Sequence, residues 1–304
     1  MKLLVNCLLV SLAVLLLDTQ GPPPDPSIDL VVLKSKIFHN TRSLRVLLPA
    51  GYTEPVNRER HYPVLYFHDG IATFSPRAIN IKAIIEPLIR AGALPPMIVV
   101  GIDNGGSTLE SKNPAADRAN EFLPYPDTGF PGMTYEPDPP HPQGQLYPLF
   151  LSKEVMPLIN HTYRTRTGAS HTSLGGFSFG ATCALYCAIK MPNAFGRLLL
   201  ESTPLWIGPD NRLLKDCESC KHWPAIISIG VGSEESPDKT IVNQGRALHD
   251  RLVAAVKQNA PKSRIVFVVD EGGKHDAASW GKRLPEVLKV LYSGWDGKDA
   301  QRLK

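Results

Sequence analysis

The sequence predicts an α/β protein in which a mostly parallel, eight-stranded sheet is flanked by helices on both faces. Short apolar segments, typical of strands buried on both faces, alternate along the chain with longer segments of helical periodicity. The chain has 304 residues, of which 43% are hydrophobic and 20% are charged. This length and composition suit one sizeable globular core and exclude a disordered or fibrous protein.

The first twenty residues have the organisation of an export signal. Lys2 precedes an apolar run from Leu3 to Leu17, and polar, proline-rich sequence follows. The run is short for a bilayer span, so a membrane anchor is the weaker interpretation. We expect residues 1–20 to be a signal peptide and residues 21–304 to form a single domain, secreted or periplasmic, without a membrane span.

Five elements are predicted before the first long loop. Two β-rich segments separated by a four-residue turn favour an antiparallel hairpin at one edge of the sheet. A continuous apolar run that ends in His68-Asp69-Gly70 indicates a buried strand, and a helix and a second buried strand follow. In chain order these elements are Ile28–Phe38, Ser43–Leu48, Tyr62–Phe67, Pro76–Ala91 and Met97–Ile102.

Two irregular insertions interrupt the pattern. Between Asn113 and Pro148 the sequence is rich in Pro, Gly, Asp and Tyr, and a loop of this length in a compact domain is usually functional or disordered. It follows the strand 97–102, so it should leave the carboxyl edge of the sheet, where α/β proteins bind ligands. We expect it to line a binding cleft together with the second insertion, 203–223.

The second half of the chain continues the alternation. A helix from Leu146 to Tyr163 leads to a strand that ends at Ser178, and another helix follows that serine. Successive strand-helix-strand units favour parallel strands with helices on both faces. The remaining elements are strand Arg197–Leu200, strand Ala225–Val231, helix Thr240–Gln258, strand Arg264–Val269 and helix Ala277–Tyr292.

The segment Gly176-Phe-Ser-Phe-Gly180 places a serine between two glycines where the predicted strand meets the predicted helix. A sharp strand-to-helix turn needs small residues two positions before and after the serine, because a Cβ there would collide with the neighbouring backbone. A turn of this kind presents the Oγ of a nucleophilic serine in the α/β-hydrolase fold. The five residues alone are a hypothesis that the rest of the chain must support.

A serine nucleophile needs a base to accept its proton and a carboxylate to orient that base. In the α/β-hydrolase fold these groups follow in the order serine, acid, histidine. Ser178, an acidic cluster after the next-to-last strand and His275 after the last strand have this order, and each lies at the carboxyl end of a predicted strand. Glu234, Glu235 and Asp238 all fall on the acid's loop, and we choose Glu235.

The other histidines come too early in the chain for the base. His68, His141 and His171 are more simply explained as solvent-facing or capping residues. Backbone donors for the oxyanion of a tetrahedral intermediate are expected from Phe179, directly after the serine, and from Gly70 or Ile71, after the strand 62–67.

The net charge and the cysteines bear on three other possibilities: nucleic-acid binding, a disulfide and a metal site. The net charge of +4 is too small to indicate nucleic-acid binding. We expect Cys183 and Cys187, four residues apart on a predicted helix, to be buried and inert. Cys217 and Cys220 could form a disulfide, remain free thiols or hold a metal with His222, but a single C-x-x-C lacks the second pair that a zinc site needs.

Segments from nearly the whole mature chain resemble the "Putative esterase" family, which includes enterochelin esterase, esterase D (S-formylglutathione hydrolase), feruloyl esterases and the mycobacterial mycolyltransferases. Gly232-Ser-Glu-Glu235 is similar to the family's Gly-Thr-x-Glu/Asp turn, which favours Glu235 as the acid. Ala181 differs, because a further glycine is frequent there in the family. The other similar segments are Ser43–Tyr52, Tyr62–Gly70, Arg118–Tyr125, Gly176–Gly180 and Gly273–His275 with Trp280.

The resemblance implies a serine carboxylesterase that works through an acyl-enzyme intermediate on a small-molecule or polysaccharide-linked ester, without a metal or cofactor. Arg118 is expected either to hold an anionic group of the substrate or to form an ion pair with Glu121. Acyl transfer to an acceptor other than water, and a catalytically silent binding protein on the same scaffold, are the alternatives. The sequence does not determine the acyl group, the alcohol or the oligomeric state.

Overall fold

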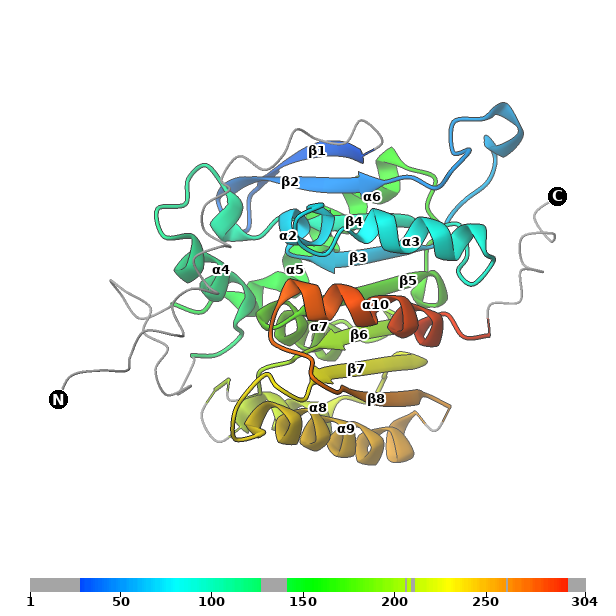
Figure 1. Cartoon of the computed structure of the whole chain (residues 1–304). Helices are drawn as coiled ribbons and strands as arrows, with labels where there is room; N and C mark the ends of the chain where they lie inside the picture. The colour runs from blue at the N-terminus through cyan, green and yellow to red at the C-terminus, as the bar shows by residue number, and fades with distance from the viewer. Residues whose placement is uncertain (1–27, 127–140, 206, 209–210, 261, 295–304) are drawn as a thin grey trace.

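One eight-stranded sheet forms the centre of the fold, and its strand order is β1-β2-β4-β3-β5-β6-β7-β8 (Figure 1). The computed structural model describes residues 28–126, 141–205, 207–208, 211–260 and 262–294, so the predicted signal peptide lies outside the described residues. β2 runs antiparallel to β1 and β4, and every pair from β4–β3 to β7–β8 is parallel. The predicted mostly parallel sheet with an antiparallel edge hairpin is therefore confirmed. The strands are β1 (Ile28–Ser35), β2 (Asn40–Leu47), β3 (Val64–His68), β4 (Ile98–Ile102), β5 (Thr172–Phe177), β6 (Arg197–Glu201), β7 (Ile226–Gly232) and β8 (Arg264–Asp270).

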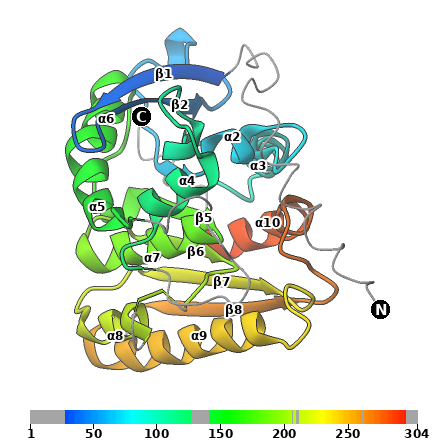
Figure 2. The same cartoon turned by 90° about the vertical axis from the view of Figure 1, so that its left-hand side faces the viewer.

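Helices cover both faces of the sheet (Figure 1, Figure 2). α2, α3 and α10 pack on one face, and α4 to α9 lie on the other. The helices are α2 (Gly70–Phe74), α3 (Ile81–Arg90), α4 (Pro114–Phe122), α5 (Tyr147–Phe150), α6 (Met156–Thr162), α7 (Phe179–Lys190), α8 (Arg212–Ser219), α9 (Thr240–Asn259) and α10 (Ala277–Leu291).

The central strands send alternate side chains into two apolar clusters. In β3, Val64 and Tyr66 join the cluster beneath α4 to α9, whereas Leu65 and Phe67 join the cluster beneath α2, α3 and α10. A strand covered on both faces needs apolar residues at every position. This explains why β3 and its neighbour β4 are continuous apolar runs in the sequence.

Both predicted insertions contain a helix where irregular structure was expected, so this part of the prediction was wrong. α4 begins at Pro114, next to Asn113, whose side chain accepts a hydrogen bond from Ala116 N at 3.3 Å. It buries Ala116, Ala119 and Phe122, which recur every three residues along one face. α8 forms in the second insertion without a side-chain cap and buries Leu213, Asp216 and Cys217. Each helix is short and lies between turn-forming residues, so its apolar residues repeat too few times for the helical period to be recognised in the sequence.

Two predicted helices differ in detail. The helix expected over 76–91 begins only at Ile81, because Asn80 before it has a left-handed backbone conformation. The helix expected over 146–163 is divided into α5, a π-helical turn at Leu151–Val155 and α6.

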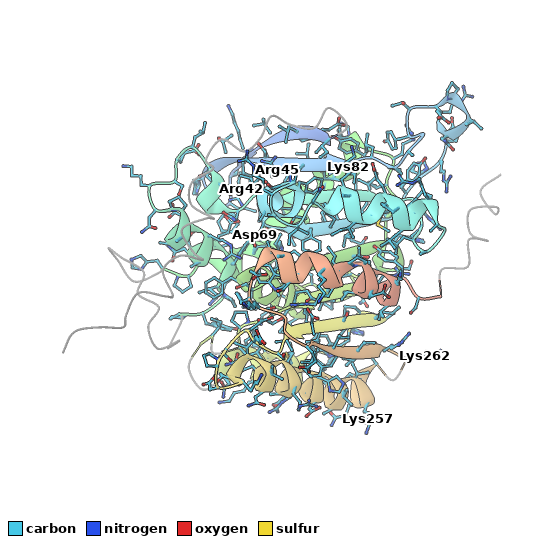
Figure 3. The ribbon with its side chains drawn as sticks, in the orientation of Figure 1. Arg42, Arg45, Asp69, Lys82, Lys257 and Lys262 are labelled. Carbon is cyan, nitrogen blue, oxygen red and sulfur yellow. The ribbon has the colours of Figure 1, made fainter. Side chains whose placement is uncertain are left out.

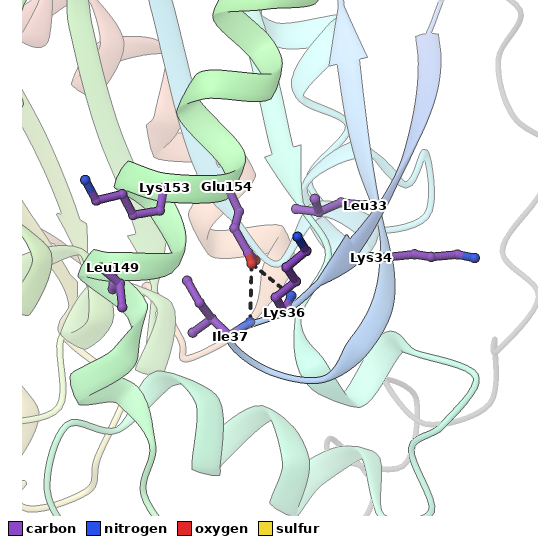
Figure 4. Close-up of a pocket in the computed structure, with 7 residues that line it drawn as sticks. All are labelled: Leu33, Lys34, Lys36, Ile37, Leu149, Lys153 and Glu154. Carbon is purple, nitrogen blue, oxygen red and sulfur yellow. Dashed lines mark hydrogen bonds between the residues drawn. The ribbon is translucent and has the colours of Figure 1, made fainter.

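The π-helical turn carries Glu154, which fixes the edge hairpin to the helical layer. Its Oε1 accepts hydrogen bonds from Lys36 N at 2.8 Å and Ile37 N at 3.2 Å, and its Oε2 accepts one from Ser35 Oγ at 2.7 Å. Figure 4 shows the bonds from Lys36 and Ile37 to Glu154, beside a surface hollow of about 450 Å³ lined mainly by aliphatic and lysine side chains. The hollow contains none of the predicted site residues.

The four described cysteines are buried free thiols. Cys183 and Cys187 are buried on α7, as expected. Cys217 and Cys220 do not form the disulfide that the sequence left open. Within the described ranges, no helix is long and apolar enough to cross a membrane.

His68 was expected to face solvent or cap an element, and this was wrong. The imidazole is fully buried at the end of β3, with its ring centre 5.3 Å from that of Phe122 and 5.0 Å from that of Tyr147. Its Nδ1 donates a hydrogen bond to Gly180 O at 2.7 Å. Burial lowers the pKa of His68 from 6.5 to about 4, although the bond to Gly180 and the charge of Asp69 partly oppose this.

We predict that His68 makes the fold acid-sensitive. Between pH 6.5 and about 4 the unfolded chain binds a proton at this residue that the folded protein does not bind. The free energy of unfolding should therefore fall with decreasing pH over this window, by about 3 kcal/mol in all. Urea unfolding at pH 7, 6 and 5 should show a smaller loss for His68→Asn, which keeps a donor near Gly180 O, and an unchanged loss for His61→Asn, whose histidine is exposed. Equal losses in all three proteins would contradict the assignment.

The crossing of β5 and α7 gives a second prediction. A Cβ at Gly176 would collide with the carbonyl group of Gly180, whereas a Cβ at Gly281 on α10 would approach no atom closer than 3.6 Å. Gly176→Ala should destabilise the protein by about 1–3 kcal/mol, because backbone must move to make room. Gly281→Ala should leave stability unchanged or raise it, since alanine favours a helix interior. Thermal unfolding of both variants tests the pair, and equal midpoints would exclude the steric explanation.

Candidate active site

Ser178 occupies the sharp junction between β5 and α7. Its backbone has φ 52° and ψ −129°, a combination that residues with a side chain rarely adopt. The strand and the helix can cross this closely because Gly176 lacks a side chain, whereas the lack of one at Gly180 makes room for the side chains of His68 and Asp69 and not, as expected, for neighbouring backbone. Ser178 N donates to Glu201 O at 2.9 Å, which ties the turn to the neighbouring strand β6. The serine thus stands at the carboxyl edge of the sheet, the edge that faces the viewer in Figure 2.

His275 lies on the loop between β8 and α10, and both of its ring nitrogens contact predicted site residues. Nε2 is 3.0 Å from Ser178 Oγ, and Nδ1 is 2.8 Å from Glu235 Oε2. An ionised carboxylate only accepts hydrogen bonds, so Nδ1 carries the proton and Nε2 is left to accept one from the Ser178 hydroxyl. The ring also meets Trp280 edge-on, with 5.0 Å between ring centres.

Glu235 is the acidic residue of its loop that reaches His275. Its side chain is fully buried, and Oε1 accepts hydrogen bonds from Gly232 N at 2.6 Å and Ser202 Oγ at 2.5 Å. Burial acts to raise the pKa of this carboxyl, but hydrogen bonds from His275, Ser202 and Gly232 hold it below its usual value. The side chain of Asp238 instead accepts hydrogen bonds from the amide and the hydroxyl of Thr240, and Glu234 is exposed.

A buried polar network behind Glu235 was not predicted from the sequence. Ser202 Oγ accepts hydrogen bonds from Trp280 Nε1 at 2.8 Å and Arg283 Nη2 at 2.9 Å, and donates its own to Glu235. Arg283 also donates to Glu201 Oε2 at 2.5 Å. Trp280 and Arg283 are three residues apart on α10 and so share one helix face, which is a signal the sequence does contain. Ser202, with φ 52°, gives no such signal.

The amides expected to stabilise an oxyanion lie at the starts of two helices. Phe179 is the first residue of α7, and Gly70 and Ile71 are the first two residues of α2. The first N–H groups of a helix have no acceptor within that helix, so they can donate to a ligand. Gly70 packs against β4, where a Cβ would lie 2.8 Å from the carbonyl carbon of Gly101. A larger residue at position 70 would displace the start of α2.

Arg118 forms its ion pair with Asp69. Nε is 2.7 Å from Asp69 Oδ1, and Nη2 is 2.8 Å from Asp69 Oδ2. Glu121, the partner expected from the sequence, is buried against Arg42, with Nη1 2.6 Å from its Oε1. The expected ion-pair partner of Arg118 is therefore corrected to Asp69.

Metal ligands do not gather in the described part of the chain. There, no group of three or more His, Cys, Asp or Glu side chains is arranged to hold a metal ion. The contacts of Ser178, His275 and Glu235 have instead the geometry that proton transfer from a hydroxyl to an imidazole requires, with a carboxylate behind the imidazole. This arrangement can carry out acyl transfer.

Known proteins are similar to this chain in sequence and in fold. A family model described as "Putative esterase" matches residues 35–291. The iron(III) enterobactin esterase of Dickeya dadantii (strain 3937) is 26% identical over 171 residues, which are 51% of this chain and 37% of that protein. The matched region thus spans little more than a third of that relative's length.

Two solved structures show the same fold. The BES protein from Bacillus cereus superposes with a TM-score of 0.69 at 20% identity, over 90% of this chain and 98% of that one. The enterobactin esterase FES from Shigella flexneri superposes with a TM-score of 0.65 at 22% identity, over 90% of this chain and 60% of that one. The fold is that of the α/β-hydrolases, and since the family model covers most of the sequence, the chain belongs to the "Putative esterase" family.

Proposed function

We propose that the protein is a serine esterase that hydrolyses a carboxylic ester through an acyl-enzyme intermediate, with Ser178 as nucleophile, His275 as general base and Glu235 as the acid that orients the base. The observation that carries the proposal is the continuous chain of contacts from Ser178 Oγ to His275 Nε2 at 3.0 Å and from His275 Nδ1 to Glu235 Oε2 at 2.8 Å. Membership of the "Putative esterase" family supports the same chemistry.

In the acylation step, Ser178 Oγ attacks the ester carbonyl carbon while His275 Nε2 takes the hydroxyl proton. The electrons of the carbonyl bond move to its oxygen, and the amides of Phe179 and of Gly70 or Ile71 stabilise the resulting oxyanion. The intermediate collapses when the bond to the alcohol oxygen breaks and His275 gives that oxygen its proton. Water then repeats the sequence on the acyl-enzyme, which releases the acid and restores Ser178.

Glu235 supports the imidazolium that forms in each step. The hydrogen bonds that lower the pKa of its carboxyl keep it ionised in mildly acidic solution, so it remains a negative charge next to Nδ1. Its second oxygen is held by Gly232 N and Ser202 Oγ, which fixes the direction in which the carboxylate meets the ring.

For the substrate we propose a small-molecule or polysaccharide-linked ester, bound in a cleft lined by the two insertions 113–148 and 203–223, of which residues 127–140, 206 and 209–210 lie outside the described residues. Two of the similar proteins are named as enterobactin esterases, so enterobactin is one ester to assay beside p-nitrophenyl acetate and methyl ferulate. We also propose that residues 1–20 direct export and are then removed.

Removal of the nucleophile is the first test. Ser178→Ala should lower kcat on p-nitrophenyl acetate by at least ~1000-fold, because no other group supplies the attacking oxygen. Ser170→Ala is the matched control, since this exposed serine precedes the other end of β5 and should have wild-type activity. A Ser178→Ala protein that hydrolyses the ester at the wild-type rate would refute the proposal.

The choice of acid is tested by two neighbouring residues. Glu235→Gln keeps the shape of the side chain but removes the charge next to His275 Nδ1, so kcat/KM should fall by roughly 10²–10⁴-fold. Glu234→Gln alters an exposed side chain and should change kcat/KM less than about twofold. Steady-state kinetics at neutral pH distinguishes the two variants, and the reverse pattern would move the acid to Glu234.

A further inference from the structure

A bidentate ion pair lies beside the amides proposed to bind the oxyanion. Asp69 is the residue between β3 and α2, directly before Gly70, and it is only 7% exposed. Its carboxylate receives Nε and Nη2 of Arg118 at 2.7 and 2.8 Å, and Oδ1 also accepts a hydrogen bond from Asn104 Nδ2 at 2.6 Å. The proposed reaction steps give no role to these side chains.

The same carboxylate lies next to the first turn of α7, the segment that supplies the other amide. A Cβ on Gly180 would lie 3.1 Å from Asp69 Oδ2, so the glycine lets the carboxylate reach the first turn of α7. The neighbouring residue His68 donates to Gly180 O at 2.7 Å. The guanidinium carbon of Arg118 lies 5.6 Å from the centre of the Phe179 ring, which is within cation–π range. Asp69 and Arg118 therefore contact both segments that supply the amides.

The backbone of Asp69 needs this support. Its φ of 57° and ψ of 54° are left-handed, a conformation that an aspartate adopts at some energetic cost. Two donors from Arg118 and one from Asn104 fix the carboxylate on one side. Behind the loop, Asp103 packs against Gly70 and is itself held by Arg45, with Nε–Oδ1 at 2.8 Å and Nη2–Oδ2 at 3.0 Å. Figure 3 labels Asp69 and Arg45 close to the position of α2 in Figure 1.

We propose that Asp69, held by Arg118 and Asn104, is a positioning residue that fixes the amides of Gly70 and Ile71 relative to the amide of Phe179, and this inference rests on the proposed esterase function. Arg118 then acts on the shape of the oxyanion site and does not bind an anionic group of the substrate. Its Nε and Nη2 already face a carboxylate that is more than nine-tenths buried, with which a substrate anion would have to compete.

Kinetics of Asp69→Asn and Arg118→Met on p-nitrophenyl acetate tests the proposal. Loosening the amides weakens binding of the transition state but leaves binding of the neutral ester alone. We expect kcat to fall roughly 10- to 100-fold, while KM changes less than about twofold. The inhibition constant of a trifluoromethyl ketone, whose adduct with Ser178 carries an oxyanion, should rise by the same factor as kcat/KM falls. Arg118→Lys keeps the charge without the two-pronged geometry and should restore only part of kcat.

Arg197→Met is the matched control for lost stability. Arg197 is the first residue of β6, so it lies at the amino-terminal end of the parallel strands, away from Ser178. Its guanidinium donates hydrogen bonds to Leu291 O and Ser170 O. Its loss should therefore lower the melting temperature without changing kcat. Arg118 is partly exposed, so its variants test the proposal even where Asp69→Asn does not fold.

The outcomes separate the inference from the function it rests on. An unchanged kcat in Arg118→Met, or a rise in KM for anionic esters alone, overturns the positioning role while Ser178→Ala remains inactive. If Ser178→Ala is as active as the wild type in the same assay, the esterase proposal itself fails.

Discussion

The close crossing of β5 and α7 at Ser178 is the constraint on which the site depends. The serine has a backbone conformation that is unfavourable for a residue with a side chain, and it is held there by the hydrogen bond from its amide to Glu201 O and by α7, which begins at the next residue. Gly176 allows the strand and the helix to meet, and Gly180 allows the first turn of α7 to approach His68 and Asp69. The crossing turns Oγ toward His275 and puts the amide of Phe179 at the start of a helix, so one piece of backbone places both the proposed nucleophile and a proposed oxyanion donor.

Buried charges hold the parts that surround this turn. Taking a charged side chain out of water costs several kcal/mol, and a buried ion pair recovers this only when its geometry is good. Such pairs contribute little to stability but allow few orientations. Arg283 and Ser202 contact Glu235, the proposed acid, and Arg118 holds Asp69 beside the proposed oxyanion site. The two networks fix the orientation of the polar side chains around Ser178. Apolar packing alone would not set these orientations.

The fold could be predicted from the sequence where the patterns are long or strongly biased. Strands buried on both faces are continuous apolar runs, and β3 and β4 stand out for this reason. α4 and α8 could not be recognised, because each has fewer than ten residues and lies between turn-forming segments. Their stability comes from packing against the rest of the protein, which local propensity does not describe. The same holds for His68, whose burial depends on rings supplied by α4 and α5.

By itself the sequence determined the order of the elements, the glycines that the turn at Ser178 requires and the loops on which an acid and a histidine could meet it. Only the tertiary structure decided which side chains meet: Glu235 among three acidic residues, Asp69 as the partner of Arg118, and Ser202 with Arg283 behind the acid. The reason is physical. Local sequence fixes backbone conformation over a few residues, whereas a hydrogen bond between residues 40 or 97 positions apart, as His275 forms with Glu235 and Ser178, exists only once the whole sheet has brought their loops together.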